Sequence, residues 1–397
     1  MDFELSDEEQ AFQQALRKFG DKTLRPNERR IDAEGRIPRE VLDEMAKLGL
    51  LAMPVPTEYG GMGGSAVLTE LAAEEIGRGD FSMATAVFFL LEAGWGWSLA
   101  QHGTEEAKRE ILPPVCQGKT FLGIATTEPT GGSDLARMRT NSHREGDGFS
   151  VRGEKAFLSG VEEAKSMGGG HLTLTKSTDG DGFNFLYVPT NAPGNSTQKF
   201  QNMGRMGIST GAITYADTKV PRKYLLGEEG RGFQYAVEGF TVARTFVSAA
   251  CVGAAERALE VGLAYIKERP AFGQPLGKFE GIQFEAVDLY AQIEAVKWQC
   301  RRAAWLLDRY TLRGDDSHRS EVAKAVASVK LTAPPVAFET VKRVMMWFGA
   351  AGYTKDVGLE LGLRGVMSYL VGAEGGLNIM RIIIGRELLG KEFLPYT

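Results

Sequence analysis

Apolar residues recur at helical spacing in the first part of the chain. Ser6 and Glu9 form a capping box, and the apolar residues that follow lie three or four positions apart. The same spacing continues in VLDEMAKLGL, AVLTELAAEEIGR and TEEAKREILPPV, which glycine- and proline-bearing turns separate. The pattern predicts an N-terminal α-helical domain over residues 1–122.

The apolar period shortens to two over residues 123–235. The segments HLTLTK, FNFLYVP and GAITYADTKVP alternate or carry β-branched and aromatic residues, and Asp-Gly and Asn-Ala-Pro-Gly turns break them. This region is therefore predicted to be a middle domain of β-strands, either a small β-barrel or a sandwich.

Long amphipathic helical patterns return over residues 236–397. Pro334 and Pro335 lie in one of them and are expected to start a helix or kink one. Long helices joined by short links indicate a C-terminal four-helix bundle. The predicted fold class is α+β, with helices expected over residues 236–267, 281–313, 319–349 and 375–390.

Composition excludes several classes of function. A formal net charge of -5 provides no basic surplus for nucleic acid. The acidic N-terminus does not resemble a secretion signal, and no apolar run reaches the roughly 18 residues that span a bilayer. Cys116, Cys251 and Cys300 are odd in number and widely spaced, so we expect reduced thiols in the cytoplasm. The histidines lack metal-ligand spacing, and no metal site is expected.

Three short stretches carry candidate chemistry. In FLGIATTEPTGGSDLARMRT, hydroxyl groups and glycines can hold phosphate oxygens or a polar ring edge, although a strand and turn also explain the pattern. Arg269 can offer a forked cation to a pyrophosphate, or be a solvated residue at a helix end. Glu374 lies among glycines in GAEGGLNIMR, where a solvent-exposed turn is the alternative.

A further stretch, GMGGSA at residues 61–66, fits the pattern G-x-G-x-x-A of dinucleotide-binding loops. It follows prolines rather than a clean strand, and no βαβ repeat comes after it. We therefore do not expect a Rossmann domain.

Four motifs together resemble those of the acyl-CoA dehydrogenase family, in the family's order and over nearly the whole chain. The chain has T-E-P-x-x-G-S-D at residues 127–134 and R-x-x-F-G at residues 269–273. The run MGRMGISTGAITYADTKVPRKYLLGEEGRGF is similar to the second barrel signature. EGGLNIMRIIIGRE is similar to the family's C-terminal motif.

The resemblance implies FAD held non-covalently between barrel and bundle. Phe157 and Ser159 stand where the family usually has a Trp and a Thr against the flavin. Arg269 and Phe272 would reach the FAD of a neighbouring subunit, which implies a homodimer or homotetramer. The cofactor-binding residues implied in this way are Ile124, Thr126, Thr127, Ser133, Phe157, Ser159, Arg269, Phe272, Gly376 and Asn378.

By the same resemblance Glu374 is the catalytic base. It would take the α-proton of an acyl-CoA thioester while the β-carbon loses hydride to flavin N5, and electrons would pass to an electron-transferring flavoprotein. Some relatives place the base at the position that is Ala243 here. Arg244 would contact the CoA part or the end of the acyl pocket, or form a buried ion pair. The substrate-binding residues implied are Ser133, Arg244, Glu92, Ala373 and Gly375.

The chain departs from the family pattern near Glu374. Arg364 is followed by glycine instead of aspartate and stands one residue further from Glu374 than usual, which implies a bulge or shifted loop. Ala373 replaces a common tyrosine, so a cyclic or aryl-substituted acyl group could fit. Glu92 interrupts an apolar run, either as a partly exposed or hydrogen-bonded helix residue or as a polarity selector or second acid/base.

Other interpretations stay open at the level of sequence. Trp95 and Trp97 fit the core or an interface better than a substrate contact. A flavin oxidase or monooxygenase on the same fold is the alternative enzyme, and a non-catalytic homologue is the other alternative. The sequence leaves the acyl group, the direction of reaction and the choice between dimer and tetramer open.

Overall fold

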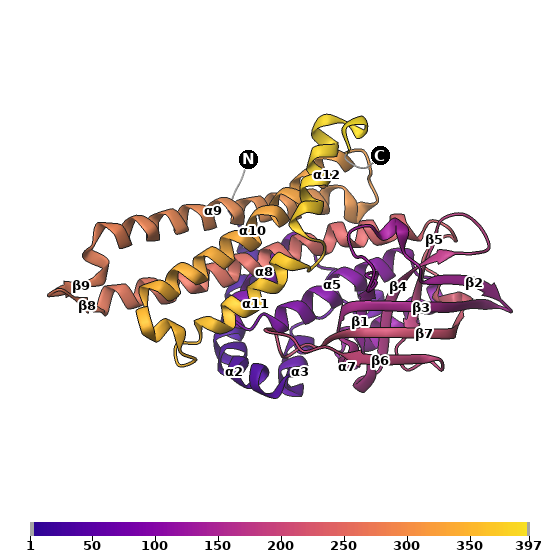
Figure 1. Ribbon diagram of the computed structural model, residues 1–397, viewed down its shortest axis with the longest axis horizontal. Helices are drawn as coiled ribbons and strands as arrows, with labels where there is room; N and C mark the ends of the chain where they lie inside the picture. The colour runs from indigo at the N-terminus through magenta and orange to yellow at the C-terminus, as the bar shows by residue number, and fades with distance from the viewer. Residues whose placement is uncertain (1–3, 395–397) are drawn as a thin grey trace. The chain divides into compact units, whose positions relative to one another are not determined.

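The structure is a computed structural model that describes residues 4–394 (Figure 1). Helices come first along the chain, then strands, then helices again, as the sequence predicts. The chain forms two compact units. Unit 1 comprises Met1–Glu34, Ala66–Ala86 and Arg244–Thr397, and unit 2 comprises Gly35–Ser65 and Val87–Ala243. The division into three domains at residues 1–122, 123–235 and 236–397 is a division of the sequence, and its boundaries stay a prediction.

The N-terminal helices begin at the predicted capping box. The Ser6 N–H donates to Glu9 Oε2 at 2.8 Å, and the Glu9 N–H donates to Ser6 Oγ at 3.3 Å. The segment 61–66 follows a 3₁₀ turn and leads into a helix, so it lacks the strand that a dinucleotide-binding loop needs. The elements are α1 (Asp7–Phe19), the π-helical turn η1 (Gly20–Leu24), α2 (Arg25–Glu34), α3 (Arg39–Lys47), the 3₁₀ turn η2 (Thr57–Tyr59), α4 (Ala66–Gly79), α5 (Ala84–His102) and α6 (Glu105–Cys116).

The strands of unit 2 form one sheet of seven strands within residues 4–394 (Figure 1). Its order is β1-β4-β2-β3-β7-β6, and β5 pairs with β4. β1 runs parallel to β4, with Phe121 opposite Gly169, while β3 and β7 are antiparallel. The elements are β1 (Phe121–Ala125), the 3₁₀ turn η3 (Leu135–Arg137), β2 (Asn141–Glu145), β3 (Gly148–Ser159), α7 (Val161–Ser166), β4 (Gly169–Ser177), β5 (Phe183–Pro189), β6 (Asn195–Lys199), β7 (Thr210–Pro221) and η4 (Arg222–Tyr224).

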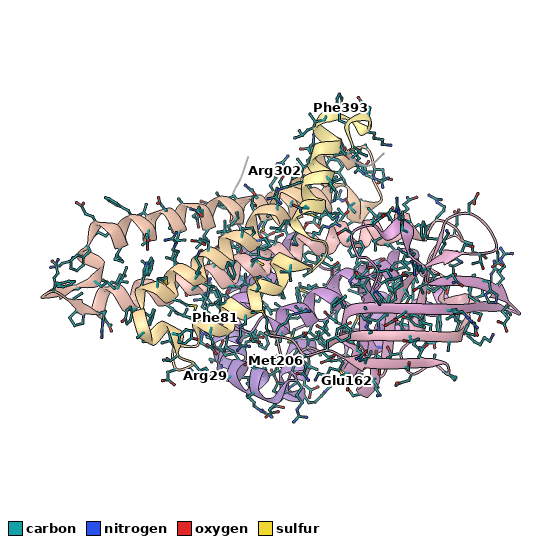
Figure 2. The ribbon with its side chains drawn as sticks, viewed as in Figure 1. Arg29, Phe81, Glu162, Met206, Arg302 and Phe393 are labelled. Atoms are coloured by element: carbon teal, nitrogen blue, oxygen red, sulfur yellow. The ribbon has the colours of Figure 1, made fainter. Side chains whose placement is uncertain are left out.

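The C-terminal helices are long and pack on one another in unit 1. α10 packs against α9, α11 and α12, and side chains fill the spaces between these ribbons (Figure 2). The elements are α8 (Gly232–Glu268), the hairpin β8 (Pro270–Ala271) and β9 (Gln274–Pro275), η5 (Leu276–Lys278), α9 (Glu280–Arg309), η6 (Thr311–Arg313), α10 (Arg319–Trp347), η7 (Gly349–Tyr353), α11 (Leu359–Val371), α12 (Leu377–Leu389) and η8 (Lys391–Phe393).

Two details of this region differ from the sequence-based expectation. Pro334 and Pro335 lie inside α10, which continues through both, so they do not start a helix. Helix α11 was not expected. Gly362 and Gly365 count against a helix in a sequence-based prediction. Each is a glycine because a neighbouring residue packs where a side chain would lie. A Cβ on Gly362 would lie 2.8 Å from the ring of Phe81, a residue labelled in Figure 2.

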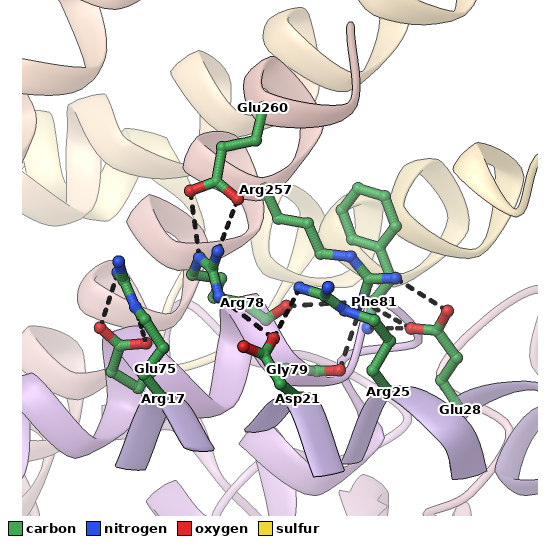
Figure 3. Close-up of polar contacts among 10 residues, drawn as sticks. All are labelled: Arg17, Asp21, Arg25, Glu28, Glu75, Arg78, Gly79, Phe81, Arg257 and Glu260. Carbon is green, nitrogen blue, oxygen red and sulfur yellow. Dashed lines mark hydrogen bonds and ion pairs between the residues drawn. The ribbon is translucent and has the colours of Figure 1, made fainter. Parts of the chain in front are cut away.

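Ion pairs, one of them buried on both sides, link the helices of unit 1 (Figure 3). Arg257 on α8 contacts Glu28 on α2 at 2.6 Å, and each side chain is 9% exposed. Arg257 also stacks over the ring of Phe81 at 4.5 Å. On the neighbouring turns Arg78 pairs with Glu260 at 2.6 Å. Since a charge taken out of water is costly unless it is paired, these helices are held in one arrangement.

No helix within residues 4–394 has the length and apolar character needed to cross a bilayer.

We expect Glu28→Gln to lower the free energy of unfolding by about 3–5 kcal/mol, because it leaves the Arg257 guanidinium buried without its counter-charge. Equilibrium urea unfolding measures the effect. Glu34→Gln is the matched control on the same helix. Its partner Arg30 is bound at 2.8 Å in an exposed pair, so a loss of no more than about 0.5 kcal/mol is expected. Equal losses in the two variants would contradict the assignment.

Candidate active site

Glu374 lies in the turn between α11 and α12, and its backbone is left-handed. Its φ is 54°, a conformation that costs a residue other than glycine energy. The turn is closed by the N–H of Gly375, which donates to the carbonyl of Gly372 at 2.9 Å. Glu374 is only 8% exposed. The carboxylate therefore does not belong to a solvent-exposed turn.

Arg244 on α8 holds this turn by its main chain. Its Nε donates to the carbonyl oxygen of Glu374 at 2.8 Å. Burial lowers the pKa of Arg244 to about 10, although the nearby Glu374 carboxylate acts in the opposite direction. The guanidinium is thus a buried group that positions the candidate base. Ala243, at the rival base position, is fully buried.

The departures from the family pattern near Glu374 have packing reasons. Arg364 forms a two-pronged pair with Asp32, at 3.1 and 2.9 Å. Gly365 packs so closely that a Cβ would lie 2.6 Å from the carbonyl oxygen of Ser82. An aspartate at this position would clash with the chain at residues 82–83. The turn that carries the extra residue contains Glu374 in the left-handed conformation, and a shift relative to the family stays a prediction.

The residues around Glu374 are small. Ala373 is half-buried, and Gly375 has a φ of 102°, which only glycine adopts without strain. Gly376 occupies the N-cap position of α12. The Asn378 amide oxygen accepts from Arg381 at 2.8 Å on the exposed side of that helix. The first three residues have little or no side chain, whereas Asn378 is engaged on its own helix.

In unit 2, a buried lysine fixes the loop that follows β1. Lys155 Nζ donates to the Thr126 carbonyl and to Glu128 Oε1, both at 3.0 Å. Burial lowers the pKa of Lys155 to about 8, against the Glu128 charge. Burial raises the pKa of the Glu128 carboxyl, but the main-chain N–H of Arg139, the charge of Lys155 and the hydrogen bonds from Thr140 outweigh it, and the net shift is downward. Glu128 is therefore a structural anchor.

The predicted cofactor residues of unit 2 lie at the end of β1, on this loop and on β3 beside it. The Ala156 N–H donates to the Thr127 carbonyl at 2.9 Å, which brings β3 against the loop. Thr126 is buried, Ile124 and Thr127 are half-buried, and Ser133 is exposed. The loop residues, Phe157 and Ser159 thus belong to one region of unit 2.

Phe157 occupies a bulge of β3. The pairing with β7 shifts register between Ala156 and Leu158, and Phe157 has a φ of 60°. The bulge turns its ring outward, where it is 64% exposed, with Phe200 at a ring distance of 5.3 Å. Strained backbone of this kind is concentrated at functional sites, so the outward ring of Phe157 is a candidate binding surface.

Arg205 contacts the predicted cofactor residue Ser159, and the sequence did not reveal it. Its Nη1 donates to Ser159 Oγ at 3.1 Å and its Nη2 to Thr210 Oγ1 at 3.0 Å. It also has a positive φ, 45°. Because a hydroxyl has one proton, Ser159 can accept from Arg205 and still donate to another group. The one available signal was an arginine inside the second barrel signature.

Arg269 and Phe272 lie far from Glu374 within unit 1. They belong to the β8–β9 hairpin at the end of α8, where Phe272 is 97% exposed and has a φ of 48° (Figure 1). Arg244, which contacts Glu374, is on the same continuous helix. At about 1.5 Å per residue, the axial distance from Arg244 to Glu268 is about 36 Å. The hairpin therefore cannot serve the Glu374 turn of its own chain.

Glu92 on α5 is fully buried, and it is hydrogen-bonded. Its Oε1 accepts from the Leu122 N–H at 3.1 Å. Burial raises the pKa of Glu92 well above the ordinary value, and the bond from Leu122 only partly opposes this. Trp95 and Trp97 are also buried, and Trp95 packs edge-on against Phe240 at 5.2 Å. Both tryptophans belong to the core of unit 2.

Three family models match the chain in sequence. They are the N-terminal domain of acyl-CoA dehydrogenase at residues 6–119, its middle domain at residues 123–218 and its C-terminal domain at residues 230–389. The chain is also 33% identical over 394 residues to the protein named "Probable acyl-CoA dehydrogenase YngJ" of Bacillus subtilis (strain 168). That alignment covers 98% of this chain and 100% of the relative.

The chain belongs to the acyl-CoA dehydrogenase family. It is an oxidoreductase that acts on an acyl-CoA.

Solved structures agree with this assignment of the acyl-CoA dehydrogenase fold. Butyryl-CoA dehydrogenase from Megasphaera elsdenii is similar at a TM-score of 0.89 and 28% identity, over 98% of this chain and 100% of that chain. A chain in the structure of the electron transferring flavoprotein of Acidaminococcus fermentans is similar at a TM-score of 0.90 and 28% identity, again over 98% and 100%.

For this acyl-CoA dehydrogenase we expect Glu92→Gln to be increasingly more stable than wild type as the pH rises. The folded protein holds the Glu92 proton more tightly than the unfolded chain does. Its contribution is therefore complete below the ordinary value of 4.5 and is lost as the pH rises through the raised folded value.

Thermal unfolding of both proteins between about pH 5 and pH 8 measures the difference. Glu58→Gln, at an exposed position of the same unit, should show no such trend. A constant difference between Glu92→Gln and wild type would show that Glu92 is charged when buried.

Proposed function

We propose that this acyl-CoA dehydrogenase desaturates an acyl-CoA thioester between its α- and β-carbons, with Glu374 as the catalytic base. The observation that carries the proposal is a buried carboxylate-bearing turn, held through its main chain by Arg244 at 2.8 Å and surrounded by small residues. The motif around Glu374 resembles the segment in which the family has its base. The presence of Glu374 favours a dehydrogenase over an oxidase or monooxygenase.

As a member of this family, the enzyme uses FAD. The residues present fit a flavin. Phe157 turns an exposed ring outward from a strained bulge, and the Ser159 hydroxyl beside it can donate to a ring edge while it accepts from Arg205. The loop at residues 126–133 adds hydroxyls and main-chain N–H groups, and a Cβ on Gly131 would meet nothing within 4 Å. We place the flavin against this loop and the β3 bulge in unit 2, and we propose that the sheet closes as a barrel and that the C-terminal helices of unit 1 form a four-helix bundle.

When bound, the flavin accepts hydride from the β-carbon. The protein supplies the rest. Glu374 takes the α-proton, and removal from bulk water makes a carboxylate a stronger base by disfavouring its charged form. Arg244 fixes the main chain of the base, so the carboxylate is already oriented when the substrate binds. Ser133 and Arg244 are proposed to contact the substrate as well.

The small size of the residues beside Glu374 favours a broad acyl group. Ala373, Gly375 and Gly376 have little or no side chain, and we propose a cyclic or aryl-substituted acyl-CoA as substrate. Glu92 is proposed to add a polar group to the acyl side. The similarity to a chain in a structure of an electron transferring flavoprotein supports such a protein as the electron acceptor.

Glu374→Gln is expected to lower the rate of flavin reduction by about 100- to 10,000-fold, because general-base catalysis contributes this much. The measurement is anaerobic mixing with a panel of acyl-CoAs while flavin absorbance is followed. Glu339→Gln on α10 is the control, since its carboxylate pairs with Arg343 on the same helix. Rapid bleaching by Glu374→Gln, with FAD bound, would remove Glu374 from the mechanism.

We also propose that each active site takes Arg269 and Phe272 from a neighbouring subunit, in a homodimer or homotetramer. The support is the exposed hairpin, about 36 Å along α8 from the contact with Glu374. At that distance, neither the Arg269 cation nor the exposed Phe272 ring reaches the Glu374 turn of its own chain. They suit the pyrophosphate and flat ring of a cofactor held by another chain.

Mixed oligomers test this exchange of residues. Glu374→Gln and Arg269→Ala subunits are each expected to be impaired alone. In a hybrid, the site that keeps Glu374 receives Arg269 from the other subunit, so about half of wild-type activity per dimer should return through one complete site. A hybrid no more active than the two parents would show that Arg269 acts within its own chain.

A further inference from the structure

Lys330 is a fully buried lysine on α10 that the proposed mechanism leaves without a role. Its exposed fraction is 0%, and its Nζ donates to the main-chain carbonyl of Tyr369 at 2.9 Å. Tyr369 lies near the C-terminal end of α11, the helix that leads into the turn with Glu374. The contact therefore joins α10 to the approach of the candidate base.

We propose that Lys330 is a positioning residue for Glu374. It fixes the last turn of α11 through the Tyr369 carbonyl, and its positive charge acts on the carboxylate of the base. The assignment rests on the proposed role of Glu374 as base.

The first part of the argument is geometric. The last carbonyls of a helix lack partners within the helix, and a cation is the donor that its negative end favours. The chain then turns at once, since the N–H groups of Gly372 and Ala373 both donate to the Ser368 carbonyl at 3.3 Å. Tyr369 is itself fully buried, and its hydroxyl lies 3.5 Å from the Met83 carbonyl.

Lys330 and Arg244 thus hold the two ends of one short segment. Lys330 binds the carbonyl of Tyr369, and Arg244 binds the carbonyl of Glu374. The two cations come from different helices, α10 and α8. A segment held at both ends keeps the left-handed conformation of Glu374 that its own sequence does not favour.

The second part concerns charge. The charged groups that act on Lys330 are Arg244 from α8 and Glu374 from the turn. Cys251 from α8 also faces it, but burial raises the pKa of that thiol to about 12, so it is uncharged at neutral pH. Burial lowers the pKa of Lys330 to about 8, Arg244 adds to the shift and Glu374 opposes it. Lys330 is therefore mainly protonated at neutral pH, and it stabilises the charged form of a carboxylate nearby.

Stability alone does not account for a lysine here. Methionine has a similar length and would fill the same space without removing a charge from water. The charge and the donor are what methionine lacks, and both act toward the segment that carries Glu374.

Lys330→Met and Lys330→Gln separate these two properties. Lys330→Met is expected to lower kcat by about 10- to 100-fold, because small displacements of a catalytic group have effects of this size. It should also move the acid limb of the pH profile of kcat/KM to higher pH, because a cation near the base is lost. Lys330→Gln keeps a donor for the Tyr369 carbonyl, so most of kcat should return while the acid limb stays displaced.

A measurement that needs no turnover accompanies the kinetics. Hydrogen exchange of the amides at residues 370–376 should be faster in Lys330→Met and close to wild type in Lys330→Gln. Lys342→Met is the matched control, because Lys342 is an exposed lysine of the same helix that pairs with Glu339. It should leave kcat, the pH profile and the exchange unchanged.

Lys330→Met with wild-type kcat and a wild-type pH profile would overturn the proposal. If Lys330→Met does not fold with FAD, Lys330→Gln decides, and an unshifted acid limb in that variant would overturn it. Glu374→Gln is measured in the same series. If Glu374→Gln remains active, the proposed base is wrong. If Glu374→Gln is inactive and the Lys330 variants behave as wild type, only the role of Lys330 is wrong.

Discussion

The hydrogen bond from Arg244 Nε to the main-chain carbonyl of Glu374 is the contact on which the candidate site depends. At 2.8 Å it ties a turn of glycines and a left-handed glutamate to α8, the longest helix within the described residues. A bond to the main chain fixes where the residue stands, whichever charge state the carboxylate adopts during a reaction. The base can therefore gain and lose a proton without release of its turn.

Several site residues also share an unfavourable backbone. Phe157, Arg205, Phe272 and Glu374 all have positive φ values, between 45° and 60°. Each such residue costs of order 1–3 kcal/mol and persists only where its surroundings enforce it. Phe157 is enforced by a register shift in β3, Phe272 by a hairpin and Glu374 by bonds at both ends of its segment. Ala52, Met83 and Asp217 have positive φ values as well, so this strain accompanies the candidate site residues without being confined to them.

The sequence predicts the helices and strands that are determined by residues close together along the chain. FNFLYVP is a strand because its alternation and β-branched residues suit a sheet, and Ser6 starts a helix because Glu9 is three residues away. Helix α11 was missed because Gly365, which a propensity argument counts against a helix, is required by the approach of Ser82, far away in sequence. Contacts of that kind leave no periodic signal.

The candidate site also contains residues that the sequence predicts and residues that it does not. Glu374 was found because its motif resembles a known one, and the comparisons establish the family on other grounds. Arg205 and Lys330 were missed because the partners of Arg205 lie on separate strands and that of Lys330 is a main-chain carbonyl on another helix. A carbonyl has no residue type, so no spacing of side chains could have indicated that contact.

Each unit holds a candidate site segment in the same way, through a buried lysine that donates to a main-chain carbonyl. In unit 2, Lys155 is fully buried and donates to the carbonyl of Thr126, in the loop of the predicted cofactor residues. In unit 1, Lys330 is fully buried and donates to the carbonyl of Tyr369, before the predicted base. Burial lowers the pKa of each to about 8. Since a buried lysine is a poor way to stabilise a core, its repeated use against main-chain carbonyls indicates that rigid placement of these segments outweighs the cost of desolvation.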